Sequence, residues 1–117
     1  GRIFIDYTLF KNIAVNLVSN AIKFSPENSV IKIACLNTAQ YFIFKVTDYG
    51  IGISEDDQKH LFERFFRAKN AVNVQGTGLG LHIIAKYLEM MNGTIEIKSE
   101  LNKGSEFTVK IPQLNYE

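Results

Sequence analysis

One glycine cluster organises this sequence: Gly76-Thr77-Gly78-Leu79-Gly80-Leu81. A segment with helical spacing of apolar residues follows it, so its backbone N–H groups and the helix N-terminus would form a site for anions such as phosphates. The cluster is not a Walker A loop, because no Gly-Lys-Ser/Thr follows. It is also a poor dinucleotide fingerprint, because Leu81 takes the last glycine position and the cluster lies late in the chain. If this cluster is considered alone, a glycine-rich hinge that binds no ligand is a serious alternative to a phosphate site.

A polar line on an earlier helix is the second motif. Asn16, Asn20 and Lys23 stand at i, i+4 and i+7, which places them on one face beside the apolar stripe. A line of two amide side chains followed by an ammonium group is suited to binding a triphosphate. For these three residues alone, a solvated helix face is the favoured interpretation.

The third motif is Asp48-Tyr49-Gly50-Ile51-Gly52. Asp48 ends an apolar strand, and a carboxylate there needs a hydrogen-bond donor. The two glycines permit a sharp turn and a close approach to the backbone. An Asp that caps its own turn is the alternative, because such turns are common at Asp-x-Gly sequences.

Read in chain order, with Phe62-Glu63-Arg64-Phe65-Phe66-Arg67 before the glycine cluster, these motifs closely resemble the N, G1, F and G2 boxes of the histidine-kinase catalytic and ATP-binding domain. That domain has the Bergerat fold of the GHKL superfamily. The resemblance covers nearly the whole chain. The resemblance implies ATP and Mg²⁺ as cofactors, which no single one of these motifs establishes by itself.

The resemblance also implies roles for individual residues. It assigns Asn20 an oxygen ligand to Mg²⁺, which keeps several waters and needs few protein ligands. It assigns Lys23 a contact with the phosphates, and Asp48 a hydrogen bond from the exocyclic amine of adenine. Arg67 could reach a phosphate, whereas Phe65 is assigned to packing. The predicted ATP-binding residues are Asn16, Asn20, Lys23, Phe24, Asp48, Gly50, Gly52, Arg67, Gly76, Thr77, Gly78, Leu79, Gly80, Leu81, His82 and Ser105.

The implied reaction is phosphoryl transfer, in which the domain positions Mg-ATP and presents the γ-phosphate to a histidine on a separate dimerisation domain. Neither His60 nor His82 has a phosphoacceptor context, so we expect no catalytic residue within the chain and no activity of the chain alone. ATP-hydrolysing relatives carry a Glu one helical turn before the Mg-binding Asn. Asn16 stands there in this sequence, so we expect slow hydrolysis.

Two other functions are compatible with the same motifs. The first is an anti-sigma-factor-type serine kinase of the same fold; the aromatic box at Phe62, Phe65 and Phe66 favours the sensor kinase, since that box docks against the dimerisation helices in the family. The second is a degenerate interaction module without ATP. The joint presence of Asn20, Asp48 and the paired glycines argues against it.

Composition limits the partners and the compartment. The 117 residues, 46% hydrophobic with nine Phe, predict one domain over 1–117. A net charge of +1 makes nucleic acid an unexpected partner. Cys35, the single cysteine, is expected to be buried, and a zinc site is not expected. We expect a cytoplasmic, monomeric domain whose parent is homodimeric, could be anchored in the inner membrane, and acts indirectly on a response regulator.

The apolar spacing predicts an α/β two-layer sandwich with a mixed, mostly antiparallel sheet and about three helices on one face. One helix is expected over 9–22, capped near Thr8 and ended before Pro26, and another over 79–91. Ser54 is expected to cap a short helix, and 69–75 to be the most mobile segment. Strands are expected over 30–36, 41–47, 94–98 and 106–111, with a possible edge strand over 2–5.

Overall fold

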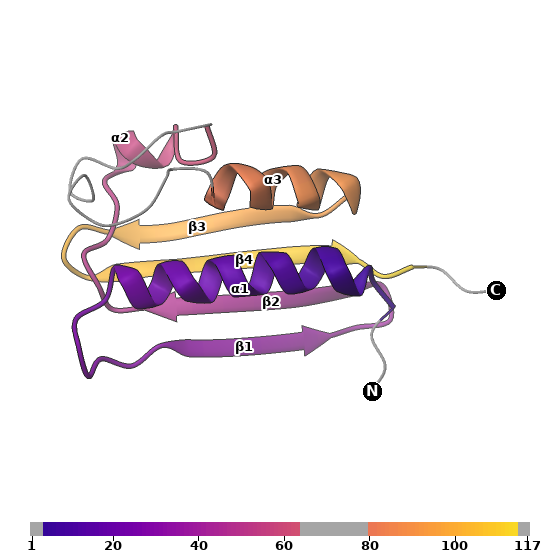
Figure 1. The fold of residues 1–117 in the computed structure, drawn as a ribbon, viewed down its shortest axis with the longest axis horizontal. Helices are drawn as coiled ribbons and strands as arrows, with labels where there is room; N and C mark the ends of the chain where they lie inside the picture. Colours follow the sequence, from indigo (N-terminus) through magenta and orange to yellow (C-terminus); the bar gives the residue numbers. More distant parts are fainter. Residues whose placement is uncertain (1–3, 64–79, 115–117) are drawn as a thin grey trace.

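The computed structural model describes residues 4–63 and 80–114 (Figure 1). Four strands form one sheet in the order β1-β2-β4-β3, and every described pairing is antiparallel. The expected sheet was mixed and mostly antiparallel, whereas the described part of the sheet is entirely antiparallel. The strands are β1 (Lys32–Asn37), β2 (Tyr41–Asp48), β3 (Thr94–Glu100) and β4 (Gly104–Pro112).

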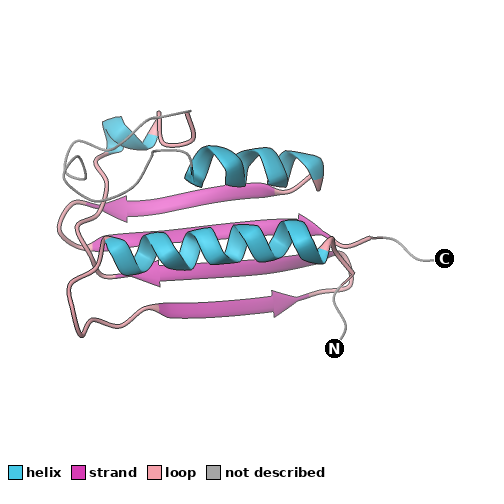
Figure 2. Cartoon of the chain, viewed as in Figure 1, coloured by secondary structure: helices cyan, strands magenta, loops and turns pink. Residues whose placement is uncertain are grey.

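Helices cover one face of this sheet, which confirms the two-layer α/β class. Figure 2 shows α1 (Tyr7–Lys23) lying over the two central strands, while α3 (Gly80–Met90) packs against α1 and β3. The short α2 (Glu55–Gln58) lies near the end of β3. Its N-cap is Ser54, as expected, because the Ser54 side chain accepts the N–H of Asp57 at 3.1 Å.

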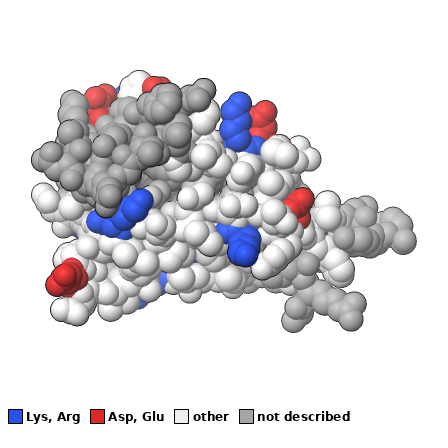
Figure 3. Space-filling model, in the orientation of Figure 1, with Lys and Arg blue, Asp and Glu red and all other residues white. Residues whose placement is uncertain are grey.

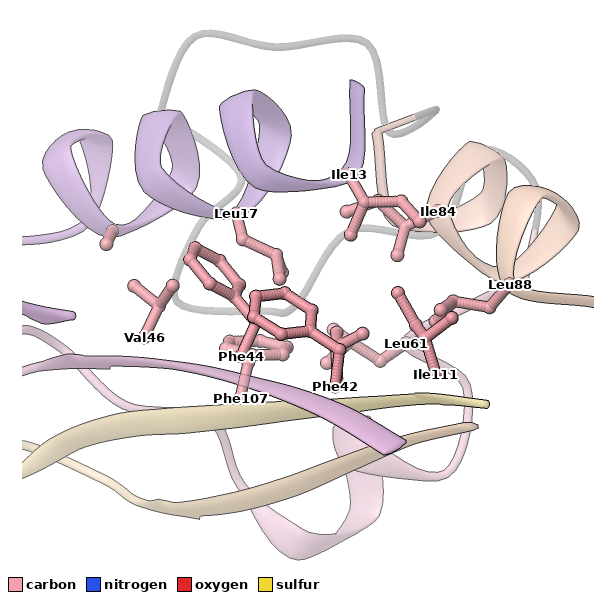
Figure 4. Packing of buried hydrophobic residues seen from close by; sticks show 12 residues of the cluster. Ile13, Leu17, Phe42, Phe44, Val46, Leu61, Ile84, Leu88, Phe107 and Ile111 are labelled. Atoms are coloured by element: carbon pink, nitrogen blue, oxygen red, sulfur yellow. The ribbon is translucent and has the colours of Figure 1, made fainter. Parts of the chain in front are cut away.

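The core lies between the helices and the sheet (Figure 4). Alternate residues of β2 and β4 face the helices, because successive side chains of a strand point to opposite faces. Phe10 of α1 packs edge-on against Phe42 and Phe44, with ring centroids 5.1 and 5.2 Å apart. The buried apolar residues are Ile13, Leu17, Ala21, Phe42, Phe44, Val46, Leu61, Ile84, Leu88, Phe107, Val109 and Ile111.

Several local expectations were wrong. Helix α1 begins before Thr8, because the Asp6 side chain caps it by accepting the N–H of Leu9 at 3.0 Å. Cys35 is exposed rather than buried, since every residue of the edge strand β1 is exposed. Phe4 and Ile5 form no strand, although the Phe4 carbonyl accepts the N–H of Leu114.

The turns follow the predicted positions more closely. Asn92, just beyond the predicted helix end at 91, adopts a left-handed conformation with φ of 58° in the turn that follows α3. Thr38 closes the β1–β2 hairpin by donating its N–H to the Tyr41 carbonyl at 2.9 Å. Strands β3 and β4 are longer than predicted, and β3 continues through Ser99 to Glu100.

Candidate functional site

The described candidate residues gather at one end of the sheet. The C-terminal ends of α1 and β2 meet the N-terminal ends of β4 and α3 there, toward the left of Figure 1. Contacts join several candidates here: Asp48 pairs with Ser105, Gly50 meets the Phe24 carbonyl, and Gly80 lies beside Asn20. The other described candidates, Asn16, Lys23, Gly52, Leu81 and His82, lie on these helices or in the turn after β2. The remaining candidates, Arg67, Gly76, Thr77, Gly78 and Leu79, lie outside the described residues, as does the segment 69–75.

Asp48 carries a buried carboxyl group at this end, with 6% of its surface exposed. It ends β2 opposite Ser105 of β4. Its carboxylate accepts the N–H of Gly50 at 2.9 Å and also the backbone N–H of Ser105. Burial raises the pKa of Asp48, and these two backbone donors oppose the rise. Asp48 therefore does cap its own turn, as the alternative interpretation held, while its carboxylate keeps capacity to accept further hydrogen bonds.

Gly50 joins this turn to the end of α1. A Cβ atom on Gly50 would lie 1.9 Å from the carbonyl oxygen of Phe24, so no larger residue fits without displacing backbone. The same oxygen accepts the N–H of Ile51 at 3.1 Å. Phe24, the C-cap of α1, thus fixes the polar line of α1 relative to Asp48.

Ser25 adds an unsatisfied polar atom at this junction. Its Oγ is buried and has no hydrogen-bond partner within the described ranges 4–63 and 80–114. The position of a Gly50 Cβ would be 3.1 Å from the Ser25 Cα. Because buried hydroxyls are nearly always hydrogen-bonded, this one is suited to a partner other than the described residues.

Gly52 and the β3–β4 hairpin hold the other side of the turn. Gly52 has φ of +70°, and a Cβ atom there would lie 2.0 Å from the carbonyl oxygen of Glu100. Ile53 donates its N–H to Ser99 Oγ at 2.8 Å, and Gln58 Nε2 donates to the Ile53 carbonyl at 2.8 Å. The glycines of this motif are therefore required by backbone packing within the protein.

The polar line of α1 faces the start of α3. Asn16 and Asn20 are half-buried and Lys23 is exposed in the last turn, where a cation also complements the helix dipole. The position of a Cβ on Gly80 would lie 4.0 Å from Asn20 Nδ2. The site therefore has acceptors around Asp48 and amide and ammonium groups along α1. That pattern fits a ligand with an amine at one end and anionic groups at the other.

The two histidines differ in their surroundings. His82 is half-buried near the start of α3, and its Nδ1 lies 3.2 Å from the carbonyl oxygen of Phe62. His60 is exposed and pairs with Glu63 at 2.7 Å, and this hydrogen bond raises the pKa of His60. His82 thus lies at the start of α3 and His60 on the surface, and the role of His82 in ATP binding stays a prediction.

Ser99 is the residue of this region that the sequence analysis missed. It continues the inward alternation of Ile95 and Ile97 on β3, so it is a polar side chain at an inward position. That break in the apolar alternation is the signal that would have identified it. The predicted strand ended at Lys98, two residues before the observed end at Glu100.

The charges on one face, the side-chain types that bind metals and the helix lengths bear on other functions. Figure 3 shows isolated basic and acidic side chains on the helix-bearing face and no broad field of one sign. Across 4–63 and 80–114, no group of three or more His, Cys, Asp or Glu side chains could hold a metal ion. No helix in that part of the chain is long and apolar enough to cross a membrane.

Comparison with known proteins identifies the class. Residues 5–115 match the family described as histidine kinase-, DNA gyrase B- and HSP90-like ATPases. The chain belongs to this family. Within it, the chain is similar to sensor histidine kinases such as SenX3 and ThkA, and it corresponds to their ATP-binding catalytic domain.

Three similar proteins illustrate this. The sensor-like histidine kinase SenX3 of Mycobacterium tuberculosis is 41% identical over 115 residues, which are 97% of this chain and 28% of SenX3. The catalytic domain of histidine kinase ThkA has a TM-score of 0.79 and 34% identity, over 93% of this chain and 70% of that one. Full-length ShkA in complex with AMPPNP has a TM-score of 0.77 and 28% identity, over 92% and 22%. The chain thus spans about 28% of the length of SenX3.

Proposed function

We propose that this domain binds Mg-ATP and presents the γ-phosphate to a histidine on a separate dimerisation domain of the same protein. The observation that carries the proposal is the fixed relation between Asp48 and the polar line of α1, joined through Gly50 and the Phe24 carbonyl. Asp48 would accept a hydrogen bond from the adenine amine. Asn16, Asn20 and Lys23 would lie toward the phosphates, and the glycine cluster 76–80 is proposed to bind them. ShkA, which was solved with AMPPNP, supports nucleotide binding at this fold.

The residues present fit a magnesium ion bound together with the nucleotide. Asn20 offers an amide oxygen, the ligand type that Mg²⁺ takes, and it lies beside the start of α3 where phosphates are expected. Bound Mg²⁺ would neutralise phosphate charge as the reaction proceeds. We propose Asn20 as its protein ligand.

The reaction we propose is displacement at the γ-phosphorus. A nitrogen lone pair of the acceptor imidazole forms the new P–N bond, the bond to the β-phosphate oxygen breaks, and ADP leaves. Within this chain, Asp48 and Ser105 hold the base, and Asn16 replaces the carboxylate that would activate water. The domain therefore works by binding and orienting the nucleotide. The phosphoryl group would pass next to a response regulator, and the cytoplasm, where ATP is available, would be the site of action.

Calorimetric titration with a non-hydrolysable ATP analogue, with and without Mg²⁺, tests this function. We expect micromolar binding that Mg²⁺ strengthens and that Asp48→Asn abolishes. Thr94→Ala is the matched control, because Thr94 is exposed at the opposite end of the sheet. Absence of binding by the unchanged chain would favour the degenerate interaction module instead.

A further inference from the structure

Three polar residues form one row across the helix-facing side of the sheet. Asp48 on β2 pairs with Ser105 on β4, and Ser105 pairs with Ser99 on β3. The next row inward is apolar, since Phe107 pairs with both Val46 and Ile97. Polar side chains thus replace the core at the end of the sheet where the adenine contact is proposed.

Ser99 Oγ is the centre of a hydrogen-bond network in this row. It accepts the N–H of Ile53 at 2.8 Å, it donates to the Gly104 carbonyl at 2.9 Å, and it lies 2.7 Å from Ser105 Oγ. A serine hydroxyl has one proton and two acceptor lone pairs. The Gly104 carbonyl can only accept, so the Ser99 proton given to it cannot also go to Ser105.

The three contacts are satisfied together in one arrangement. Ser99 donates to Gly104 and accepts from both Ile53 and Ser105. In the reverse arrangement, Ser99 would donate to Ser105 and the Gly104 carbonyl would lose this donor, at the cost of a hydrogen bond. The proton of Ser105 therefore points toward Ser99 and away from its neighbour Asp48.

The consequence concerns what the row offers to a ligand. With its proton held by Ser99, Ser105 has only lone pairs left, and the ionised Asp48 is an acceptor as well. Both would accept from an exocyclic amine, which carries two N–H donors. A ring carbonyl at the same position would face acceptors on both sides and leave them unpaired.

We propose that Ser99 is a positioning residue that keeps this end of the site acceptor-only by holding the proton of Ser105, and so selects a 6-amino purine over a 6-oxo purine. The inference rests on the proposed nucleotide binding. It adds a determinant of base specificity that itself makes no contact with the nucleotide. Ser99 would act through Ser105. An experiment can therefore distinguish this effect on base preference from a general effect on folding.

The experiment compares Mg-ATP with Mg-ITP, because inosine carries a carbonyl where adenine carries the amine. Calorimetry would give the ratio of the two dissociation constants for the unchanged chain, Ser99→Ala, Ser99→Thr, Ser105→Ala and the Ser99→Ala/Ser105→Ala double variant. We expect Ser99→Ala to reduce the preference for ATP by about three- to tenfold, the value of one neutral hydrogen bond. Ser99→Thr, which keeps the hydroxyl, should restore it.

The double variant gives the decisive comparison. If Ser99 acts through Ser105, Ser99→Ala should change the preference little once Ser105 is already alanine. An unchanged ATP preference in Ser99→Ala, or an equal loss with and without Ser105, would overturn the inference. Should Ser99→Ala fail to fold, Ser99→Cys keeps nearly the same volume with a weaker acceptor and is expected to lose part of the preference. If the unchanged chain binds ATP weakly or not at all, the proposed function fails, whatever these ratios are.

Discussion

The carbonyl oxygen of Phe24 would lie 1.9 Å from a Cβ atom on Gly50, so the end of α1 and the turn after β2 are in backbone contact. This distance leaves no space for any side chain at Gly50. The contact also links the two parts of the proposed site, because α1 carries Asn20 and the turn follows Asp48.

Gly50→Ala should therefore destabilise the fold by about 2 kcal/mol or more, since backbone must move to relieve the overlap. Gly80→Ala is the matched control: among the described residues away from its own helix, its new methyl group would meet Asn20 Nδ2 first, at 4.0 Å. We expect the control to unfold at the same or a slightly higher denaturant concentration, because Ala favours helices over Gly. Urea unfolding of both variants measures this, and equal midpoints would contradict it.

Asp48 should give the domain a particular pH dependence. Because burial raises its pKa above the ordinary 3.8, the native state binds this proton more readily than the unfolded state. The contribution of Asp48 to stability therefore falls as pH rises from 3.8 to the raised pKa, and is constant above it. We expect the unchanged chain to gain stability relative to Asp48→Asn when the pH is lowered through this window. A stability difference independent of pH in urea titrations would argue against a raised pKa.

Asn20→Ala should remove the part of nucleotide affinity that depends on Mg²⁺. Asn20 is half-buried beside Gly80, whereas Asn12 on the same helix is exposed and donates to the Thr8 carbonyl at 3.0 Å. Asn12→Ala is thus a control of the same residue type on the same helix. In Asn20→Ala, calorimetry with and without Mg²⁺ should give nearly equal dissociation constants. A Mg²⁺ effect of unchanged size would exclude Asn20 as the ligand.

The purified domain should bind ATP without rapid turnover. Asn16, one helical turn before Asn20, has no carboxylate to deprotonate a water molecule. A phosphate-release assay at saturating ATP should therefore give a rate close to that without protein. Fast release that Asn20→Ala abolishes would show that the domain is a hydrolase.

Cys35 should react under native conditions. It is exposed on the edge strand β1, and it is the single cysteine of the chain. A disulfide-exchange dye should therefore label one thiol per protein molecule. The rate of labelling should be close to that of a small free thiol, both with and without urea. Labelling that requires urea would mean that β1 is covered in solution.

For the strand residues, the sequence predicted the side of the sheet on which each side chain lies better than it predicted solvent exposure. Period-two alternation correctly grouped Phe42, Phe44 and Val46 on one face, because both central strands are covered by α1. The apolar, strand-like neighbours of Cys35 predicted that it is buried, yet β1 lies at the edge of the sheet and all its residues are exposed. Which strand is central depends on the pairing order of the sheet, and this order is not contained in any local pattern.

The candidate site was predicted to a similar extent. The motifs assigned Asp48, Ser105 and the polar line of α1 to one ATP site. The structure pairs Asp48 with Ser105 and joins the Asp48 turn to the end of α1 through Gly50 and Phe24, while their role in ATP binding stays a prediction. The hydrogen-bond partners of the site residues, such as Ser99 beside Ser105, were not predictable, because they depend on the register in which the strands pair. Ser99 belongs to the site only because β3 extends far enough for it to pair with Ser105.

The pairing of β2 with β4 also has a consequence for biosynthesis. Tyr41 pairs with Pro112, and Asp48 with Ser105, so a central strand finds its main partner only in the last part of the described chain. A ribosome would have to release nearly the whole domain before the core could close. Until then α1 and the β1–β2 hairpin would expose Ile13, Phe42 and Phe44. This long separation between paired strands predicts slow folding for a domain of this size and an early dependence on chaperones.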